Sequence, residues 1–256
     1  TPLKIPFIRG IFNFVDSLVL GMKTLTYSAG FFEDEEEEVL TEEEAAKREK
    51  TDKIIMNLTV VFAVVIAVAI FMVLPYFLSS IVERYTSSRM LMTISEGVIR
   101  LAIFLLYIFL ISRMNDIKRT FMYHGAEHKC INCIEHGLEL TVENVRKSSK
   151  QHKRCGTSFL FFVVIVSIIF CFFITAESQI LRVVIRIALL PLIAGVSYEI
   201  IKLAGNSDNV IINALSRPGM WVQNMTTKEP DDSMIEVGIR AVEEVFDWRA
   251  WQRENL

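Results

Sequence analysis

The sequence predicts an all-α membrane protein with about four transmembrane helices, amphipathic interfacial helices and a helical cytosolic segment. The chain of 256 residues is 52% hydrophobic, and its mean hydropathy of +0.39 is high for a soluble domain. Its apolar residues also gather into long runs instead of spreading evenly. Because a helix needs about 20 apolar residues to cross the hydrocarbon core of a bilayer, such runs predict transmembrane helices.

Four runs have the necessary length: residues 54–82, 90–112, 155–176 and 180–201. The first and third contain no charged residue, whereas the second holds Glu96 and Arg100. Charges at this depth normally pair and face the helix bundle, and a glutamate four positions before an arginine is placed to do so. We therefore expect a buried ion pair between Glu96 and Arg100, with Arg186 of the fourth run as a further partner.

The runs divide the chain into segments of different composition. These are an amphipathic interfacial segment (1–30), an acidic and charged cytosolic linker (31–53), transmembrane helices one and two (54–112), a cytosolic His/Cys segment (113–154), transmembrane helices three and four (155–203) and a cytosolic amphipathic C-terminal segment (204–256). The acidic run 33–38 predicts a solvated linker. In the last segment, residues 217–219 (Arg-Pro-Gly) predict a turn. Residues 231–233 (Asp-Asp-Ser) supply candidate N-caps for an amphipathic helix.

The distribution of basic residues predicts the topology. Lysine and arginine near the ends of transmembrane helices mark the cytosolic side. They are dense before the first predicted helix and in segment 113–154, and sparse in the other two connections. Both termini and segment 113–154 are therefore expected in the cytosol. Thiols in that compartment stay reduced, so the cysteines there should be free or metal-bound.

All four histidines lie between residues 124 and 155, as do three of the four cysteines. The first candidate ligand set is the H-x-x-E-H pattern of His124, Glu127 and His128. On a helix, positions i and i+4 share a face, so both imidazoles can reach one ion. Inverted zincins use the same order, with the glutamate activating a zinc-bound water. The pattern therefore predicts a zinc site with Glu127 as the catalytic base.

A second ligand set competes with the first. Cys130 and Cys133 are followed, after 18 residues, by His152 and Cys155. Two ligand pairs at this spacing are typical of a closed structural zinc site. Cys130 and Cys133 are equally well explained as small core residues. Glu199, at the predicted cytosolic end of the fourth helix, is a further candidate because carboxylates often complete catalytic zinc sites.

Several stretches resemble the YqhQ family of bacterial membrane proteins: SRMNDIKRTFMYHGAEHK, TVENVRK, HKRCGTSFL, PLIAGVSYEIIKLAG and KEPDDSMIEVGIRA. The resemblance covers nearly the whole chain from about Pro6. That family is marked by HGAEH and H-x-R-C-G-T-S-F motifs, here residues 124–128 and 152–159. The resemblance implies a multi-pass protein of a bacterial inner (plasma) membrane, labelled a metal-dependent enzyme and of unknown function. The C-x-x-C pair is not among these motifs. The resemblance therefore favours the first ligand set with His152 and Cys155 added.

Two functions are consistent with these features. The first is a zinc-dependent hydrolase acting at the cytosolic membrane surface, with His124 and His128 as ligands. The second is a non-catalytic membrane scaffold, or an accessory factor in membrane-protein biogenesis, with a structural metal site. Segment 113–154 carries nine basic and five acidic residues, a balance suited to anionic lipid, the ribosome or the translocon. Besides the lipid bilayer, a homo-oligomer is a candidate partner, whereas specific DNA binding is not expected.

The topology gives the first testable prediction. Single reporter cysteines replacing Ser87 or Lys150, in a cysteine-free background, should be labelled from opposite sides of the membrane. A membrane-impermeant maleimide applied to intact cells should label the first and not the second, and sealed inside-out vesicles should reverse this. Labelling of both positions from outside the cell would contradict the topology and the expectation of reduced thiols.

Overall fold

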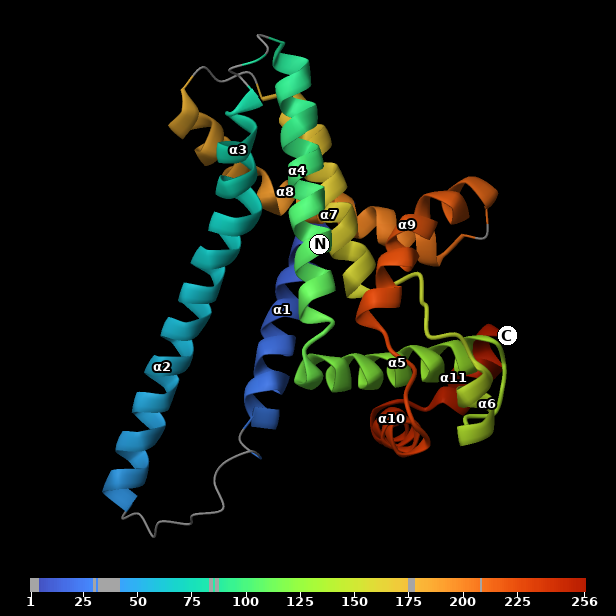
Figure 1. Ribbon diagram of the computed structural model, residues 1–256. Helices are drawn as coiled ribbons and strands as arrows, with labels where there is room; N and C mark the ends of the chain where they lie inside the picture. Colours follow the sequence, from blue (N-terminus) through green and yellow to red (C-terminus); the bar gives the residue numbers. More distant parts are fainter. Residues whose placement is uncertain are drawn as a thin grey trace. The chain divides into compact units, whose positions relative to one another are not determined.

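The computed structural model describes residues 5–29, 31, 42–82, 85, 88–174, 178–207 and 209–256. Within them every regular element is a helix (Figure 1). In chain order these are α1 (Ile8–Ala29), α2 (Glu42–Val68), the π-helix η3 (Ala69–Val73), α3 (Leu74–Ser79), α4 (Arg89–Ile111), α5 (Asn115–Glu135), α6 (Val142–Lys147), α7 (Gly156–Phe172), α8 (Gln179–Gly205), α9 (Val210–Thr226), α10 (Asp232–Val245) and α11 (Trp248–Asn255). The acidic run 33–38 lies outside the described residues.

Three stretches are long and apolar enough to cross a membrane: Lys50–Ser79, Met90–Ile111 and Leu181–Gly205. The all-helical membrane protein predicted from the sequence is confirmed at this level. The third predicted transmembrane helix corresponds to α7, which has 17 residues and is a shorter apolar helix. The structure therefore supports three spans by length and composition.

The chain divides into two compact units. Unit 1 comprises residues 1–103 and 168–195, and unit 2 comprises residues 104–167 and 196–256. Each unit has its own polar cluster, and each is described by itself.

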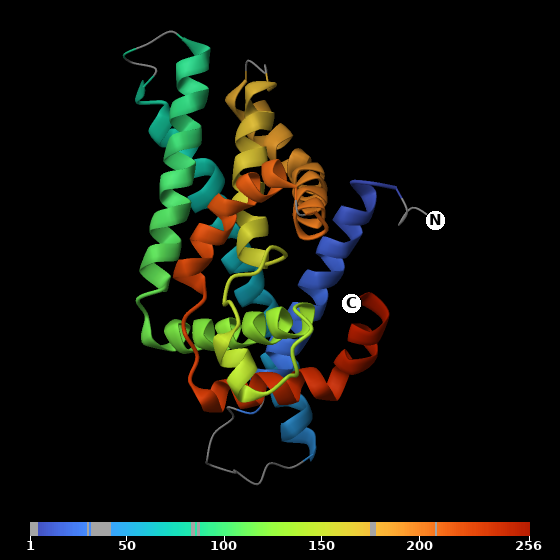
Figure 2. The same cartoon turned by 90° about the vertical axis from the view of Figure 1, so that its right-hand side faces the viewer.

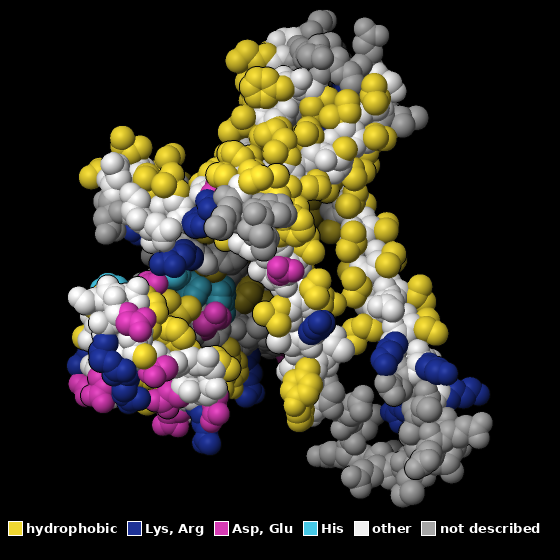
Figure 3. All heavy atoms as spheres, turned by 180° about the vertical axis from the view of Figure 1, so that it is seen from behind, with side chains coloured by type: hydrophobic (Ala, Val, Ile, Leu, Met, Phe, Trp, Pro, Cys, Tyr) yellow, Lys and Arg dark blue, Asp and Glu magenta, His cyan; other side chains and the backbone are white. Residues whose placement is uncertain are grey.

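In unit 1, α2, η3 and α3 follow one another as a single long helical stretch. Pro75 lies in the first turn of α3. A proline has no N–H and its ring crowds the carbonyl four residues earlier, so the wider turn of η3 accommodates it within the stretch. Leu58 and Phe62 of α2 are 63% and 65% exposed, and apolar side chains follow this helix in the space-filling view (Figure 3). An apolar helix surface of this kind suits contact with lipid.

Unit 1 also contains a buried cluster of charges. Arg100 Nη2 donates to Glu96 Oε1 and Arg186 Nη2 donates to Glu96 Oε2, each at 2.8 Å. Glu96 and Arg100 are each 5% exposed, and Arg186 is 8% exposed. The i, i+4 spacing brings the first two together as expected, and α8 supplies the third.

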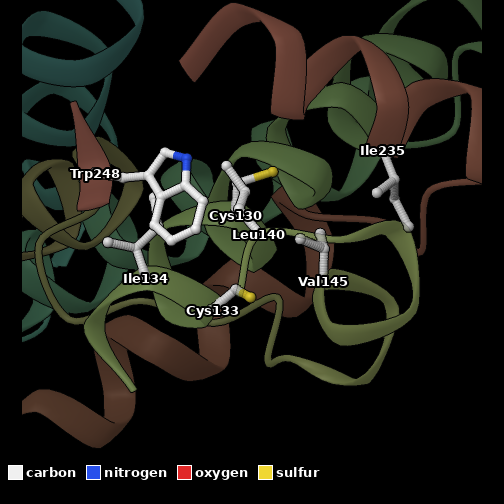
Figure 4. Close-up of a cluster of buried hydrophobic side chains, with 7 residues drawn as sticks. All are labelled: Cys130, Cys133, Ile134, Leu140, Val145, Ile235 and Trp248. Carbon is white, nitrogen blue, oxygen red and sulfur yellow. The ribbon is translucent and has the colours of Figure 1, made fainter. Parts of the chain in front are cut away.

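Unit 2 is built around α5. Helices α6, α10 and α11 pack against it, and Figure 2 shows α6 and α10 beside it. Their shared core contains seven buried residues: Cys130, Cys133, Ile134, Leu140, Val145, Ile235 and Trp248 (Figure 4). This core holds one face of α5 in place, while the histidines lie on another.

The C-terminal segment differs from expectation at one point and agrees with it at another. The predicted turn at residues 217–219 is wrong, because α9 continues through Pro218. A Cβ on Gly219 would lie 3.0 Å from Ser158 Oγ, so this glycine permits a close helix contact instead of a turn. The predicted N-cap is confirmed, since the Asp231 side chain accepts from the backbone N–H of Met234.

Candidate metal centre

Helix α5 places two imidazoles side by side. The rings of His124 and His128 lie edge to face with centroids 4.4 Å apart. Their spacing of four residues puts them on one face of α5, as the sequence predicted. Some histidine side-chain atoms are visible on this face of the molecule (Figure 3). The two rings therefore start from one rigid element, which favours a fixed geometry.

Backbone carbonyls orient both rings. His124 Nδ1 lies 2.9 Å from the carbonyl oxygen of Thr226, and His128 Nδ1 lies 2.7 Å from that of Lys150. A carbonyl oxygen can only accept, so Nδ1 must carry the proton and donate in both residues. Each neutral ring then presents the lone pair of Nε2. This hydrogen bond on the other ring nitrogen is the usual support of a metal-ligating histidine.

Cys155 completes the group. Its Sγ lies 3.4 Å from His124 Nε2, and one ligand atom from each of His124, His128 and Cys155 falls within 4.8 Å of the other two. His128 and Cys155 are 3% and 4% exposed. Cys155 directly precedes α7, and the backbone N–H of Thr157 donates to its Sγ at 3.4 Å. Three donors from two parts of the chain therefore converge.

Gly125 allows the segment after α9 to reach α5. A Cβ at this position would overlap the carbonyl oxygen of Lys228. The backbone N–H of Lys228 donates to the Phe121 carbonyl at 2.8 Å. This contact places Thr226 so that its carbonyl meets the His124 ring. The glycine of the HGAEH motif therefore has a structural role that its helix propensity does not indicate.

Two polar residues of α5 fix the loop that orients His128. Asn132 Nδ2 donates to the carbonyls of Ser149 and Gln151 at 2.8 and 3.0 Å. Lys129 Nζ donates to the carbonyls of Arg146 and Ser148, both at 2.9 Å, and pairs with a Glu229 carboxylate oxygen at 2.6 Å. The Lys150 carbonyl is thereby held where His128 Nδ1 can donate to it.

Gln223 of α9 fixes the other side of the same loop. Its Nε2 donates to the His152 carbonyl at 2.8 Å and to Ser158 Oγ at 2.6 Å, while its Oε1 accepts from the backbone N–H of His152 at 3.0 Å. The side chain is fully buried. Its amide therefore satisfies the backbone of the residue three positions before Cys155.

His152 lies near the group but does not join it. Its Nδ1 accepts from the backbone N–H of Arg154 at 3.4 Å, so Nε2 carries the proton and donates to Glu135 Oε2 at 3.0 Å. Both ring nitrogens are therefore engaged. Its ring centroid lies 5.9 Å from that of His128. In this arrangement His152 is a neighbour of the ligand group.

The remaining candidates lie in different surroundings. Cys130 and Cys133 are fully buried in the core of unit 2, and burial raises the pKa of the Cys130 thiol to about 12 and also raises that of Cys133. Glu127 is exposed on α5. Glu199 lies in α8 and is partly buried. Within the part of the chain that the structure describes, the convergent donor group comprises His124, His128 and Cys155 alone.

The electrostatics of the group favour a thiolate. Burial alone would raise the pKa of Cys155, but in the metal-free site hydrogen bonds from His124 and His128, once Nε2 is also protonated and the rings are charged, lower it to about 5. Burial likewise opposes protonation of His124, yet its hydrogen bond to Cys155 raises its pKa. Neighbouring charges of opposite sign thus outweigh desolvation. The thiolate is the form of cysteine that binds metal or attacks electrophiles.

This donor set fits a zinc ion. Imidazole nitrogen and thiolate sulfur are the ligands that zinc prefers, and three protein ligands leave a fourth tetrahedral position for water or substrate. The Sγ–Nε2 separation of 3.4 Å is compatible with two ligands of one tetrahedral ion. His124, His128 and Cys155 would hold the metal, with the Thr226 and Lys150 carbonyls orienting the rings.

Unit 2 also has a groove of about 580 Å³, whose lining does not include the three donors. Its walls come from α5, α10 and α11 and are mostly apolar, with Ile131, Val242 and Trp251 among them. Glu127, Glu135 and Arg154 add charged groups to the lining, and Arg154 Nη2 lies 3.4 Å from Glu135 Oε1. Glu127 directly precedes His128 in the chain, and Arg154 directly precedes Cys155.

The described residues form a helical protein with three helices long and apolar enough to span a membrane and a His₂Cys donor group in one of its units. The chain belongs to the family described as "Protein of unknown function (DUF1385)", which matches residues 5–248. It is 35% identical over 255 residues to the "Uncharacterized protein YqhQ" of Bacillus subtilis (strain 168), covering 98% of this chain and 80% of that relative. The family resemblance inferred from the motifs is confirmed. No solved structure matches the chain.

The sequence reasoning missed the residues that support the ligands. Gly125, Lys129, Asn132 and Gln223 were not singled out as supports of the ligands, although Gly125 lies in the HGAEH motif and the next two follow it within four residues. The sequence indicates the role of these residues only in part. A glycine and an asparagine within an otherwise good helical pattern indicate a special contact, but the partner of that contact cannot be read from the sequence.

The ligand group predicts an unusual thiol titration in the metal-free protein. After the metal is removed by chelation, the ultraviolet absorbance of the Cys155 thiolate should appear as the pH rises through about 5. This absorbance is assigned to Cys155 by its loss in Cys155→Ser. In His124→Gln this step should move to higher pH, because the thiolate loses a charged hydrogen-bond donor. Cys130→Ser is the matched control and should leave the step unchanged. A Cys155 step near the ordinary thiol pKa in the unaltered apoprotein would contradict this arrangement.

Proposed function

We propose that this protein is a metal-dependent hydrolase of the cytosolic membrane surface, with zinc held by His124, His128 and Cys155. One observation carries the proposal: two imidazoles fixed through Nδ1 by backbone carbonyls converge with a low-pKa thiol. Burying polar groups so that three metal-binding atoms face one another costs free energy unless a ligand compensates for the lost hydration. The remaining coordination position gives the site room for a reacting group.

The chemistry would be divided between the ion and the protein. A bound zinc ion supplies Lewis acidity and lowers the pKa of a bound water. Glu127 precedes His128 on α5 and is exposed, so its carboxylate is available to accept a proton from the attacking water and return it to the leaving group. The Thr226 and Lys150 carbonyls keep the imidazoles oriented, which avoids reorganisation during the reaction.

The groove supports an amphipathic substrate. Its apolar walls suit an acyl chain or the apolar side chains of a peptide, and the paired Arg154 and Glu135, with Glu127, provide polar groups beside them. Segment 113–154 is basic and flanked by apolar helices, which favours a position at the cytosolic surface of a bacterial inner membrane. A lipid headgroup or a peptide leaving the membrane fits both features.

A structural metal site is the second candidate. The near-complete burial of His128 and Cys155 supports it, as does the way the three ligands connect α5 to the start of α7. Such a site would stabilise unit 2 as a scaffold, with the basic segment available to the ribosome, the translocon or anionic lipid. In this alternative Glu127 has no chemical task.

Glu127→Gln separates the two candidates. If Glu127 is the base, the amide should keep zinc and the melting temperature while lowering the rate about 10²- to 10⁴-fold, the usual loss for a general base. In a bacterium where deletion of the gene has a phenotype, this variant should then fail to complement. Glu244→Gln, an exposed glutamate of α10, is the matched control and should complement fully.

The outcome needs zinc content and expression to be measured alongside complementation. Failure of Glu127→Gln with zinc, melting temperature and membrane level unchanged supports the hydrolase. Full complementation by Glu127→Gln at matched expression, with zinc retained, would rule out this base and leave the scaffold as the function.

A further inference from the structure

Unit 1 contains a small cavity at the end where α3 and α7 terminate and α4 and α8 begin. Its volume is about 50 Å³, and about 10–15 Å³ is enough for one water-sized body. Its walls include Tyr76 and Ser79 of α3, Glu96 of α4, and Arg182 and Arg186 of α8. Glu96 and Arg186 belong to stretches that can span a membrane, so the cavity lies among apolar helices.

The charged cluster beside this cavity has more positive than negative charge. Arg100 occupies Glu96 Oε1 and Arg186 occupies Oε2, so one carboxylate serves two guanidinium groups. The three side chains together carry a formal charge of +1. A surplus charge that is buried in apolar surroundings is costly unless a counter-ion or polar partner accompanies it.

Arg186 is the donor with spare capacity. Among the residues that the structure describes, its Nε and Nη1 atoms are buried and have no hydrogen-bond partner. The residue is 8% exposed, and its Cζ lies 5.2 Å from the centroid of the Tyr76 ring. The ring face offers a weak attraction to the cation but accepts no conventional hydrogen bond from Nε or Nη1. Buried donors of this kind almost always have a partner.

We propose that this cavity binds one small inorganic anion of about the size of chloride. The anion would accept hydrogen bonds from Arg186 and neutralise the surplus charge of the Glu96–Arg100–Arg186 cluster. Arg182 also lines the wall. A cavity of this volume favours a small monatomic anion over larger oxyanions and organic anions. An ion pair that only joins two helices needs a single arginine. The second arginine of the cluster is explained by the bound anion.

The test uses the full chain purified in an uncharged detergent, in sodium gluconate free of chloride. Sodium chloride replaces gluconate at constant ionic strength while the melting midpoint and the ³⁵Cl NMR line width are followed. A ligand that binds the folded state raises the midpoint in a saturable way. Chloride and bromide should do so and sulfate should not, and the chloride line should broaden with protein concentration.

Variants assign the effect to the cavity. Arg186→Gln should abolish both the midpoint shift and the line broadening, and Arg186→Lys should weaken chloride binding at least tenfold by removing the planar donors. Glu96→Gln should bind chloride more tightly, because it removes the competing negative charge. Arg182→Gln changes another residue of the cavity wall and should also weaken chloride binding. This variant takes the place of Arg186→Gln in the test if Arg186→Gln does not fold. Arg249→Gln, on the exposed surface of α11, is the control and should behave as the parent.

Two results would overturn the proposal. The first is a parent protein with the same midpoint in chloride and gluconate and no line broadening, which would mean that the cavity holds only water. The second is an equal loss of the chloride effect in Arg249→Gln and Arg186→Gln, which would mean nonspecific binding to surface arginines.

Discussion

The candidate metal centre depends on how closely residues 226–228 approach α5. Gly125 leaves room for the Lys228 carbonyl, and the Lys228 N–H bond to Phe121 then fixes the backbone there. This contact brings the Thr226 carbonyl to His124 Nδ1 and decides which ring nitrogen faces Cys155. Without the close approach, His124 would be free to rotate, and the low pKa of the thiol would lose its main support.

The cysteines of unit 2 show how surroundings decide the chemistry of one residue type. Cys130 lies among apolar side chains, where burial raises its pKa to about 12. Cys155 is also buried, yet two imidazoles and their charge lower its pKa to about 5. The same desolvation therefore leaves one thiol inert and the other poised as a ligand, because only Cys155 has cationic hydrogen-bond donors beside it.

The sequence could predict features that depend on local periodicity and spacing. It predicted the helical membrane protein, the shared face of His124 and His128, and the Asp231 cap, because each follows from the geometry of a single helix. It could not choose between Cys155 and His152, because that choice depends on the Glu135 carboxylate and the Arg154 N–H that engage the His152 ring. The turn predicted at Pro218 was wrong for a similar reason: Gly219 permits a contact between α7 and α9, and the sequence does not show which helices meet.

The central claim is that His124, His128 and Cys155 bind one metal ion. X-ray absorption at the zinc edge of the purified full chain tests it most directly. We expect one zinc per chain with two nitrogen ligands, one sulfur ligand and one lighter ligand, an environment unchanged in Cys130→Ser and lost in His128→Ala. A zinc environment with two or three sulfur ligands, stripped by Cys130→Ser and kept in His124→Ala, would contradict the account and place the metal at the C-x-x-C pair.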